Sequence, residues 1–168
     1  RDVSIDSRRS RDGTLFAALR GTKTHGHEFL DDAAEGGAIA AFVETPQDSP
    51  LPEFVVEDTT KALQQLSRRY RQSCTASYRI GITGTAGKTT LKTMLSRILG
   101  QNYRTGRTEG NFNNHLGLPL TLLNQGHGEL LVAEVATSGP GEIRTLGRWL
   151  RPHLGIITHV GAGHLEGL

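Results

Sequence analysis

The segment Gly84–Thr90 has residue types and a spacing that suit phosphate binding, and its sequence is Gly-Thr-Ala-Gly-Lys-Thr-Thr. Glycines let the backbone approach a phosphate closely, a lysine adds a full positive charge, and a threonine hydroxyl can ligate Mg²⁺. The apolar run 78–83 before it predicts a buried strand, and the apolar pattern after it predicts a helix, whose N-terminus also attracts anions. The usual P-loop has a glycine five residues before its Gly-Lys pair, where this chain has Ile82. The predicted phosphate loop is therefore a shorter variant.

Residues 75–168 alternate predicted strands and helices around this loop. Strands are predicted at 78–83, 130–135 and 154–160, and Pro140 suits the first turn of a helix between the last two. Fully apolar strands that alternate with helices indicate a parallel sheet covered on both faces, and ligands bind at the carboxyl ends of such strands. Polar clusters fall at these ends, in 84–90, 134–138 and 159–166. The helix after the loop is expected to bury one face, made of Leu91, Met94, Leu95, Ile98 and Leu99.

Residues 1–74 are predicted to form a separate small unit. Its strand candidates are 3–5, 14–19, 38–43 and 54–56, and its helix candidates are 27–35 and a segment that begins at Asp58 or Thr59. The polar segment 71–77 lacks a pattern and is the predicted boundary. The predicted fold class is therefore α/β, with a small N-terminal α/β domain (1–74) followed by part of a P-loop-type parallel-sheet ATP-binding domain (75–168).

The composition limits the classes of partner. The 19 lysines and arginines nearly balance the 17 aspartates and glutamates, so we expect no nucleic-acid partner, and we interpret Arg68–Arg71 as a solvated helix face. The single Cys74 excludes an internal disulfide and fits a reducing compartment. No apolar run is long enough to span a bilayer and the N-terminus does not resemble a signal peptide, so we expect no membrane insertion. We also expect a cytoplasmic protein and a monomer. The start at Arg1 and the stop at Leu168 suggest a piece of a longer protein.

Glu134 falls near the end of the strand predicted at 130–135, which should lie beside the loop strand. A carboxylate there can hold Mg²⁺ against nucleotide phosphates, and the alternative is a solvated side chain. His164 follows a glycine-rich segment at another strand end, and by itself it is more typical of a structural or exposed histidine. His25 and His27 could belong to a metal site, but no third ligand accompanies them.

Further segments accompany the phosphate loop, namely Val3–Arg8, Gly13–Phe16 with Gly26–Phe29, Gly110–Leu123, and Gly139–Ile143 with His164–Gly167. In combination they resemble the Mur ligases, whose ATP loop shares the short glycine spacing. The segment Gly110–Leu123 is similar to a segment that is particular to one branch of the family, the ligases that add D-alanyl-D-alanine to a UDP-N-acetylmuramoyl-tripeptide. The resemblance implies an N-terminal domain that binds the UDP end of the substrate, and a central domain that binds ATP and Mg²⁺.

The resemblance also implies roles for individual residues. Lys88 would contact the β- and γ-phosphates, Thr89 and Glu134 would ligate Mg²⁺, and His164 would ligate a second Mg²⁺. Ser7 and Arg8 would lie near the uridine diphosphate, and the muramoyl-peptide would meet Asn113, Asn114 and Thr137. The nucleotide would contact Gly84, Thr85, Ala86, Gly87, Lys88, Thr89, Thr90 and His159.

The chain departs from the family pattern at three places. Ala86 stands where most members have a polar residue, which removes one side-chain donor and leaves the backbone nest. The segment Val135–Ser138 replaces the family's usual Met- or Leu-Gly-Ala-Asn, and His159 replaces an asparagine that meets adenine. A modified lysine that supports the metals, and a third domain that carries the amino substrate, are expected beyond Leu168.

The reaction implied by the resemblance joins a carboxylate to an amine. The carboxylate attacks the γ-phosphate of ATP to give an acyl phosphate and ADP, and the amine of D-alanyl-D-alanine then displaces phosphate. Two alternatives stay open, a sister Mur ligase that adds a single amino acid and a nucleotide-binding fragment without activity. A P-loop kinase or GTPase would need an eight-residue loop and an Asn-Lys-x-Asp stretch, and the sequence has neither. We expect the isolated 168-residue chain to form no amide bond.

Overall fold

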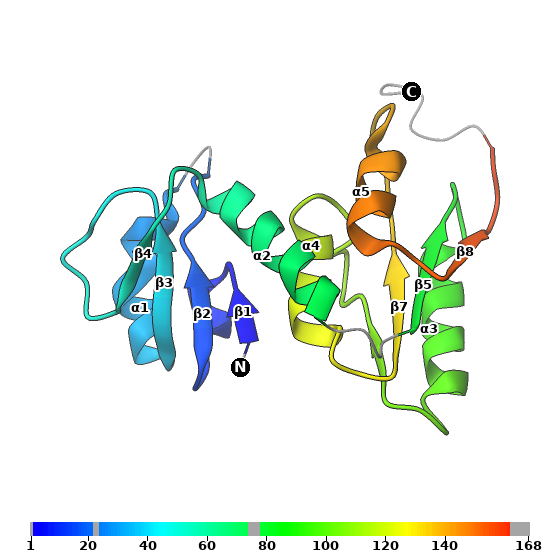
Figure 1. The fold of residues 1–168 in the computed structure, drawn as a ribbon, viewed down its shortest axis with the longest axis horizontal. Coiled ribbons are helices and arrows are strands. Elements are labelled where there is room, and N and C mark those ends of the chain that lie inside the picture. Colours follow the sequence, from blue (N-terminus) through cyan, green and yellow to red (C-terminus); the bar gives the residue numbers. More distant parts are fainter. Residues whose placement is uncertain (1, 22–23, 74–77, 162–168) are drawn as a thin grey trace. The chain divides into compact units, whose positions relative to one another are not determined.

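The structure is a computed structural model that describes residues 2–21, 24–73 and 78–161. Its contacts divide the chain into two units, Arg1–Leu66 and Ser67–Leu168, and the division falls inside helix α2 (Thr59–Ser73). Each unit contains a four-stranded sheet whose neighbouring strands are all parallel (Figure 1). The α/β fold class expected from the sequence is confirmed. The domain boundary at 74/75 stays a prediction.

The first unit has the strand order β1-β2-β3-β4. Phe16 and Val43 lie in its core, together with Leu30 and Ala33. The segment expected as one helix over 27–35 is a 3-10 turn followed by a short α-helix, because Phe29 leaves helical geometry between them with φ −115° and ψ 18°. The elements are β1 (Asp2–Ser4), η1 (Ser7–Arg9), β2 (Thr14–Ala17), η2 (Gly26–Phe29), α1 (Leu30–Glu35), β3 (Ala38–Val43) and β4 (Glu53–Val55).

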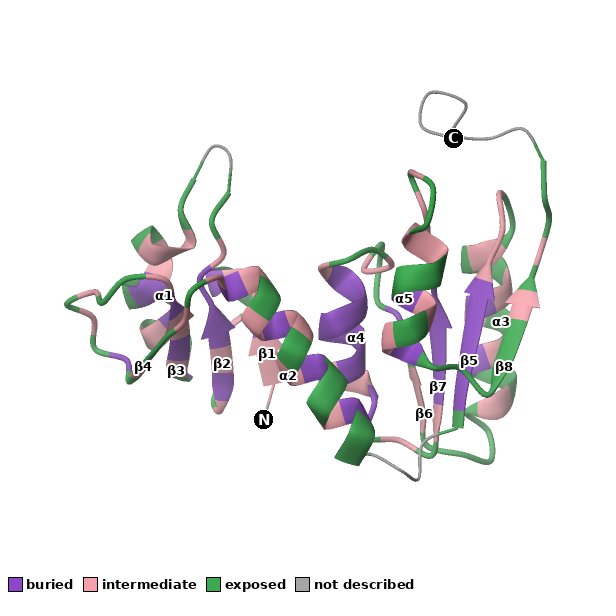
Figure 2. Cartoon of the chain, turned by 45° about the horizontal axis from the view of Figure 1, so that its top comes forward, coloured by how far each residue is buried: buried purple, intermediate pink, exposed green. Residues whose placement is uncertain are grey.

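The second unit has the strand order β6-β7-β5-β8, so β5 is a central strand between β7 and β8. Most of β5 is buried, which Figure 2 shows in purple. No helix in the described ranges is long and apolar enough to cross a membrane. The elements are β5 (Tyr78–Thr83), α3 (Lys88–Leu99), β6 (Thr105–Arg107), α4 (Gly117–Gln125), β7 (Leu130–Glu134), α5 (Glu142–Leu150) and β8 (Leu154–Ile157).

Side-chain alternation along β7 decides which helix each residue meets. Leu131 and Ala133 pack with α4 and α5, whereas Val132 packs with α3. Helices α5 and α3 lie on opposite faces of the sheet (Figure 1). Because successive side chains of a strand point to opposite faces, Glu134 is on the face of Val132. The strand therefore directs the Glu134 carboxylate toward α3, the helix that begins at the phosphate loop.

The buried face of α3 differs from the expected one. Met94 is 56% exposed and Ile98 is 59% exposed, so placing both in the core was wrong. The buried side chains are instead Lys92 and Ser96, which face β6 and β7, while Leu91, Leu95 and Leu99 are partly buried against the sheet. This orientation is possible because both polar side chains have hydrogen-bond partners in the second unit.

In the second unit, β6 and α4 were not predicted. Helix α4 has Gly117 and Pro119 in its first turn. Both residue types are typical of turns, and for this reason the sequence did not predict a helix here. Proline is tolerated in a first helical turn, since the N–H it lacks would have no partner there. The Asn114 side chain caps this turn by accepting N–H bonds from Leu116 and Gly117. A Cβ at position 117 would lie 2.2 Å from the Phe112 Cα, so this position requires glycine.

The expectation of a solvated face at Arg68–Arg71 was wrong for one residue. Arg68 and Arg69 are exposed, whereas Arg71 is buried. Arg71 follows Leu63 and Ser67 at intervals of four, and both are buried too. The buried stripe of α2 therefore continues through an arginine.

Candidate functional site

The phosphate loop joins the end of β5 to the start of α3. Gly87 precedes the helix with φ +83°, and Gly84 has φ +132°, a conformation that favours glycine. A Cβ at Gly84 would lie 2.3 Å from the Thr158 Oγ1 and 2.8 Å from the His159 carbonyl oxygen. The loop thus needs glycine both for its backbone angle and for the close approach of the segment after β8.

Residues after β8 hold the loop in shape. The Thr158 hydroxyl lies 2.6 Å from the Ala86 carbonyl and 3.2 Å from the Thr83 carbonyl. The Thr85 N–H donates to the His159 carbonyl over 2.7 Å, so the main chain of His159 contacts the loop while the residue as a whole is exposed. An adenine contact for His159 stays a prediction.

Lys88 is folded over the loop that it terminates. Its Nζ donates to the Gly84 carbonyl over 2.6 Å and lies 3.4 Å from the Thr85 carbonyl. A bound phosphate would offer the same ammonium a charged acceptor in place of these neutral carbonyls. An anion such as a polyphosphate would be bound by the positive charge of Lys88, by the N–H groups of the loop and by the N-terminus of α3. Thr90 is exposed on the first turn of α3.

Glu134 lies beside the phosphate loop because β7 pairs directly with β5. Glu134 is opposite Ile82 in the parallel register, and only 3% of its surface is exposed. The Thr89 hydroxyl donates to the Glu134 Oε2 over 3.0 Å. The expectation that Glu134 ends a strand next to the loop strand is therefore met by the register, and the solvated alternative does not apply.

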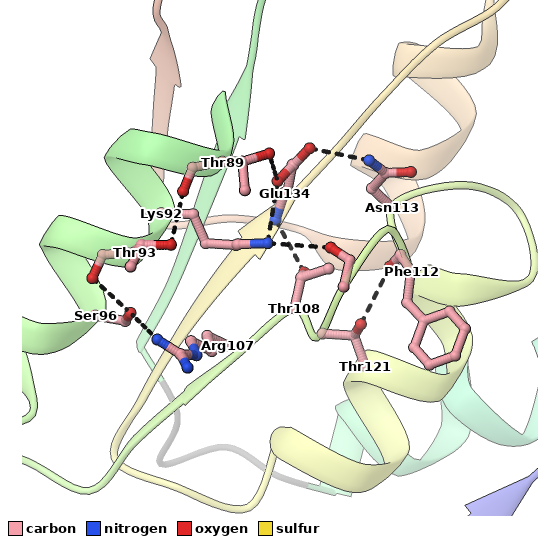
Figure 3. A network of polar contacts seen from close by, with 11 residues as sticks. Thr89, Lys92, Thr93, Ser96, Arg107, Thr108, Phe112, Asn113, Thr121 and Glu134 are labelled. Carbon is pink, nitrogen blue, oxygen red and sulfur yellow. Dashed lines mark hydrogen bonds and ion pairs between the residues drawn. The ribbon is translucent and has the colours of Figure 1, made fainter. Parts of the chain in front are cut away.

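Three further side chains hold the Glu134 carboxylate and main chain (Figure 3). The Asn113 amide donates to Oε1 over 2.9 Å, and the Lys92 ammonium lies 3.2 Å from Oε2. The Glu134 N–H donates to the Thr108 Oγ1 over 3.0 Å. Burial raises the pKa of the Glu134 carboxyl, but the hydrogen bonds from Asn113, Thr89 and Lys92 outweigh it, so this pKa lies below the usual glutamate value. The side chain is therefore ionised at neutral pH.

The donor set at this point is suited to Mg²⁺. The Thr89 hydroxyl and the Glu134 carboxylate are hard oxygen donors, and Mg²⁺ commonly takes one or two protein oxygens and fills its other positions with phosphates and water. Within residues 2–21, 24–73 and 78–161 no group of three or more His, Cys, Asp or Glu could hold a metal alone. His25 and His27 therefore belong to no such cluster. His164, expected to ligate a second Mg²⁺, lies outside the described residues.

A pocket of about 500 Å³ adjoins this carboxylate cluster in the second unit. Asn113, Asn114 and Thr137, the three residues expected to meet the muramoyl-peptide, all line it. Its wall also includes Glu142, whose carboxylate accepts the Ser138 N–H over 2.6 Å. The structure thus brings these three predicted residues together, although they come from two separate loops.

The first unit contains a smaller pocket of about 240 Å³, with Arg20, His25 and His27 in its wall. Among the described residues, those lining it do not include Ser7 or Arg8. Ser7 is buried in η1, and the Arg8 guanidinium binds the Asp6 carboxylate through two bonds of 2.9 and 2.8 Å. Contacts of Ser7 and Arg8 with a uridine diphosphate stay predictions.

Two family models cover the chain. The model described as "Mur ligase family, catalytic domain" matches residues 1–71, and the "Mur ligase middle domain" matches residues 82–168. The second match alone spans more than half of the chain. The chain belongs to the Mur ligase family.

Several curated relatives and solved structures, 34–40% identical to the chain, belong to one branch of the Mur ligases. UDP-N-acetylmuramoyl-tripeptide–D-alanyl-D-alanine ligases of Bacillus subtilis and Escherichia coli are 40% and 38% identical to the chain, over 99% and 98% of it, and it covers 37% and 36% of their lengths. A crystal structure of MurF from Acinetobacter baumannii superposes with a TM-score of 0.85 at 36% identity, covering 98% of the chain and 36% of that protein. MurF from Thermotoga maritima in complex with ADP gives 0.81 at 34% identity, with 98% and 39% covered. The chain thus spans somewhat more than a third of its relatives' length.

Three side chains of this Mur ligase site were missed from the sequence. Lys92 has a local signal, because it lies one helical turn after Lys88 and Thr89 and therefore faces the same side of α3. Thr158 falls inside the strand predicted at 154–160, one residue before the polar cluster 159–166. No sequence pattern pointed to Thr108, since the short strand β6 that precedes it was not predicted.

Proposed function

We propose that the intact protein is an ATP-dependent ligase of peptidoglycan precursor synthesis that joins D-alanyl-D-alanine to a UDP-N-acetylmuramoyl-tripeptide. The observation that carries the proposal is the meeting of Thr89 and Glu134, 3.0 Å apart, at the carboxyl ends of two adjacent parallel strands beside the loop lysine. The similarity to ligases named for this reaction supports the choice of substrates. An ATP-consuming step of this kind also agrees with the expected cytoplasmic location.

ATP would bind with its phosphates on the loop. The N–H groups between Gly84 and Thr89 would hold the β-phosphate region, and Lys88 would leave the loop carbonyls to contact the β- and γ-phosphates. Mg²⁺, held by Thr89 and Glu134, would neutralise charge that develops on the transferred phosphoryl group. The second unit has twelve lysines and arginines against five acidic residues, and this excess of positive charge favours approach of a polyanion.

The acceptor carboxylate would lie in the pocket lined by Asn113, Asn114 and Thr137. One of its oxygens attacks the γ-phosphorus, the bond to the bridging oxygen breaks, and ADP leaves with that electron pair. The amine of D-alanyl-D-alanine then attacks the acyl carbon, loses a proton, and phosphate departs. The protein mainly positions the reactants and stabilises charge, which is what the fixed loop and the buried Glu134 are suited to do.

Phosphate release by the intact protein tests this function. ATP and UDP-N-acetylmuramoyl-tripeptide would be supplied with D-alanyl-D-alanine, with single D- or L-amino acids, or with no amine. We expect sustained release only with D-alanyl-D-alanine. Release driven by a single amino acid would instead identify a sister Mur ligase, and no release with any amine would leave a nucleotide-binding module.

A further inference from the structure

The Lys92 ammonium lies inside the site that is expected to hold Mg²⁺. The Lys92 side chain is only 4% exposed, and its Nζ lies 3.2 Å from the Glu134 Oε2 and 3.3 Å from the Gly110 carbonyl. Figure 3 shows the ammonium beside Glu134. The same Oε2 accepts the Thr89 hydroxyl. The Glu134 Oε2 is therefore bonded both by Thr89, the other expected metal ligand, and by the buried ammonium of Lys92.

The other carboxylate oxygen is also occupied, so Glu134 has little freedom to turn. Asn113 donates to Oε1, and the Glu134 main chain is tied to Thr108. Thr89 donates its proton to Oε2, and when it ligates a metal it must turn a lone pair toward that metal instead. Lys92 is not a metal ligand and need not turn away from Glu134. Its only other acceptor among the described residues is the neutral Gly110 carbonyl, which binds an ammonium less strongly than a carboxylate does. The ammonium therefore stays beside the carboxylate when a metal arrives.

A metal on Oε2 and the ammonium beside it must repel each other. Mg²⁺ sits about 2.1 Å from its oxygen ligands, so it would lie within about 5.3 Å of the Lys92 Nζ. Even at the dielectric constant of water, repulsion between a divalent ion and a single charge at this distance corresponds to roughly tenfold in affinity. A metal–nucleotide complex differs, because its phosphates make it an anion overall and attract the same ammonium.

We propose that Lys92 is a positioning residue that makes this site accept Mg²⁺ with its nucleotide in preference to free Mg²⁺. Lys92 holds Glu134 in place before the metal binds, and its charge weakens the binding of a bare divalent ion. This inference rests on the proposed function, because it takes Thr89 and Glu134 as metal ligands.

The test compares two dissociation constants in the intact protein. Mn²⁺ is used in place of Mg²⁺, because its free form is counted by electron paramagnetic resonance without any turnover. Lys92→Met removes the charge and keeps a similar length, and Lys92→Arg keeps the charge. We expect Lys92→Met to bind free Mn²⁺ at least about tenfold more tightly than the wild type, and to bind the Mn²⁺–ADP complex no more tightly. Lys92→Arg should match the wild type within about threefold.

A matched control lies on the same helix. Arg97 is exposed near the end of α3, and Arg97→Met should leave both constants unchanged. Should Lys92→Met prove poorly folded by circular dichroism, Lys92→Gln removes the charge, keeps a donor for Gly110, and carries the same expectation. Free Mn²⁺ binding that is unchanged or weaker in the folded, uncharged variants would overturn the inference, as would equal tightening for free Mn²⁺ and Mn²⁺–ADP. Failure of the wild type to bind Mn²⁺–ADP would overturn the proposed function as well.

Discussion

Replacing Glu134 by glutamine should destabilise the second unit by about 3–5 kcal/mol, the range found when one partner of a buried ion pair is removed. Both side chains of the Lys92–Glu134 pair are 4% exposed, with Nζ and Oε2 3.2 Å apart. With an effective dielectric constant of about 20, their attraction at this distance is about 5 kcal/mol. Glutamine keeps the shape and can still accept from Lys92, so the variant mainly leaves a buried ammonium without its counter-charge.

Urea unfolding in the presence of EDTA measures this loss without interference from metals. The double variant Lys92→Met/Glu134→Gln should recover most of it, because replacing both members of a buried pair is often close to neutral. Glu129→Gln is the matched control. Its carboxylate is 52% exposed and lies 3.8 Å from Arg104, so we expect a change below about 1 kcal/mol.

Two results would refute this reasoning. A loss below about 1 kcal/mol for Glu134→Gln would show that the pair is solvated rather than buried. A double variant no more stable than Glu134→Gln alone would show that the loss comes from packing and not from the unpaired ammonium of Lys92.

Three further predictions concern the same loop and carboxylate. Lys88→Ala should lower the ligation rate by at least about 10²–10³-fold, the usual cost of one preorganised charge-stabilising group, and near-normal turnover would remove Lys88 from the mechanism. Gly84→Ala should abolish tight ADP binding in calorimetry, because its Cβ would clash with the Thr158 hydroxyl at 2.3 Å, and wild-type affinity would contradict the described loop. In the folded protein the pKa of the Glu134 carboxyl lies below its ordinary value of 4.5. Its contribution to the free energy of unfolding should therefore be complete above pH 4.5 and be lost as the pH falls through the pKa of the folded state. Urea midpoints in acid should therefore fall more steeply for the wild type than for Glu134→Gln, and parallel curves would exclude the shift.

The parts of the fold that were predicted correctly are those with a local pattern. Strand β5 has the predicted bounds 78–83, and α3 follows the glycine loop as expected. The place of Glu134 at the carboxyl end of a neighbouring strand was also predicted, because parallel strands end at the same edge of a sheet. The contacts of His164 stay a prediction outside the described residues.

The parts that were missed depend on contacts between distant residues. The apolar spacing of α3 placed Met94 and Ile98 in the core, yet the helix turns Lys92 and Ser96 inward. Apolar periodicity cannot show this, because it treats a polar side chain as exposed unless its partners are known. The partners of Lys92 are Glu134 on β7 and the Gly110 carbonyl, and Arg107 on β6 donates to the Ser96 hydroxyl, so all three lie outside α3.

The sequence by itself determined a phosphate loop between a buried strand and a helix and an α/β fold, since glycine spacing and apolar alternation depend on neighbouring residues. The resemblance to the Mur ligases came instead from several segments taken together. Only the tertiary structure decided how the Glu134 carboxylate is held. Thr89 is 45 positions from Glu134 in the sequence, and Asn113 is 21 positions away. Side chains so far apart meet only when strand register and helix rotation are fixed together, and the packing of the whole unit sets both.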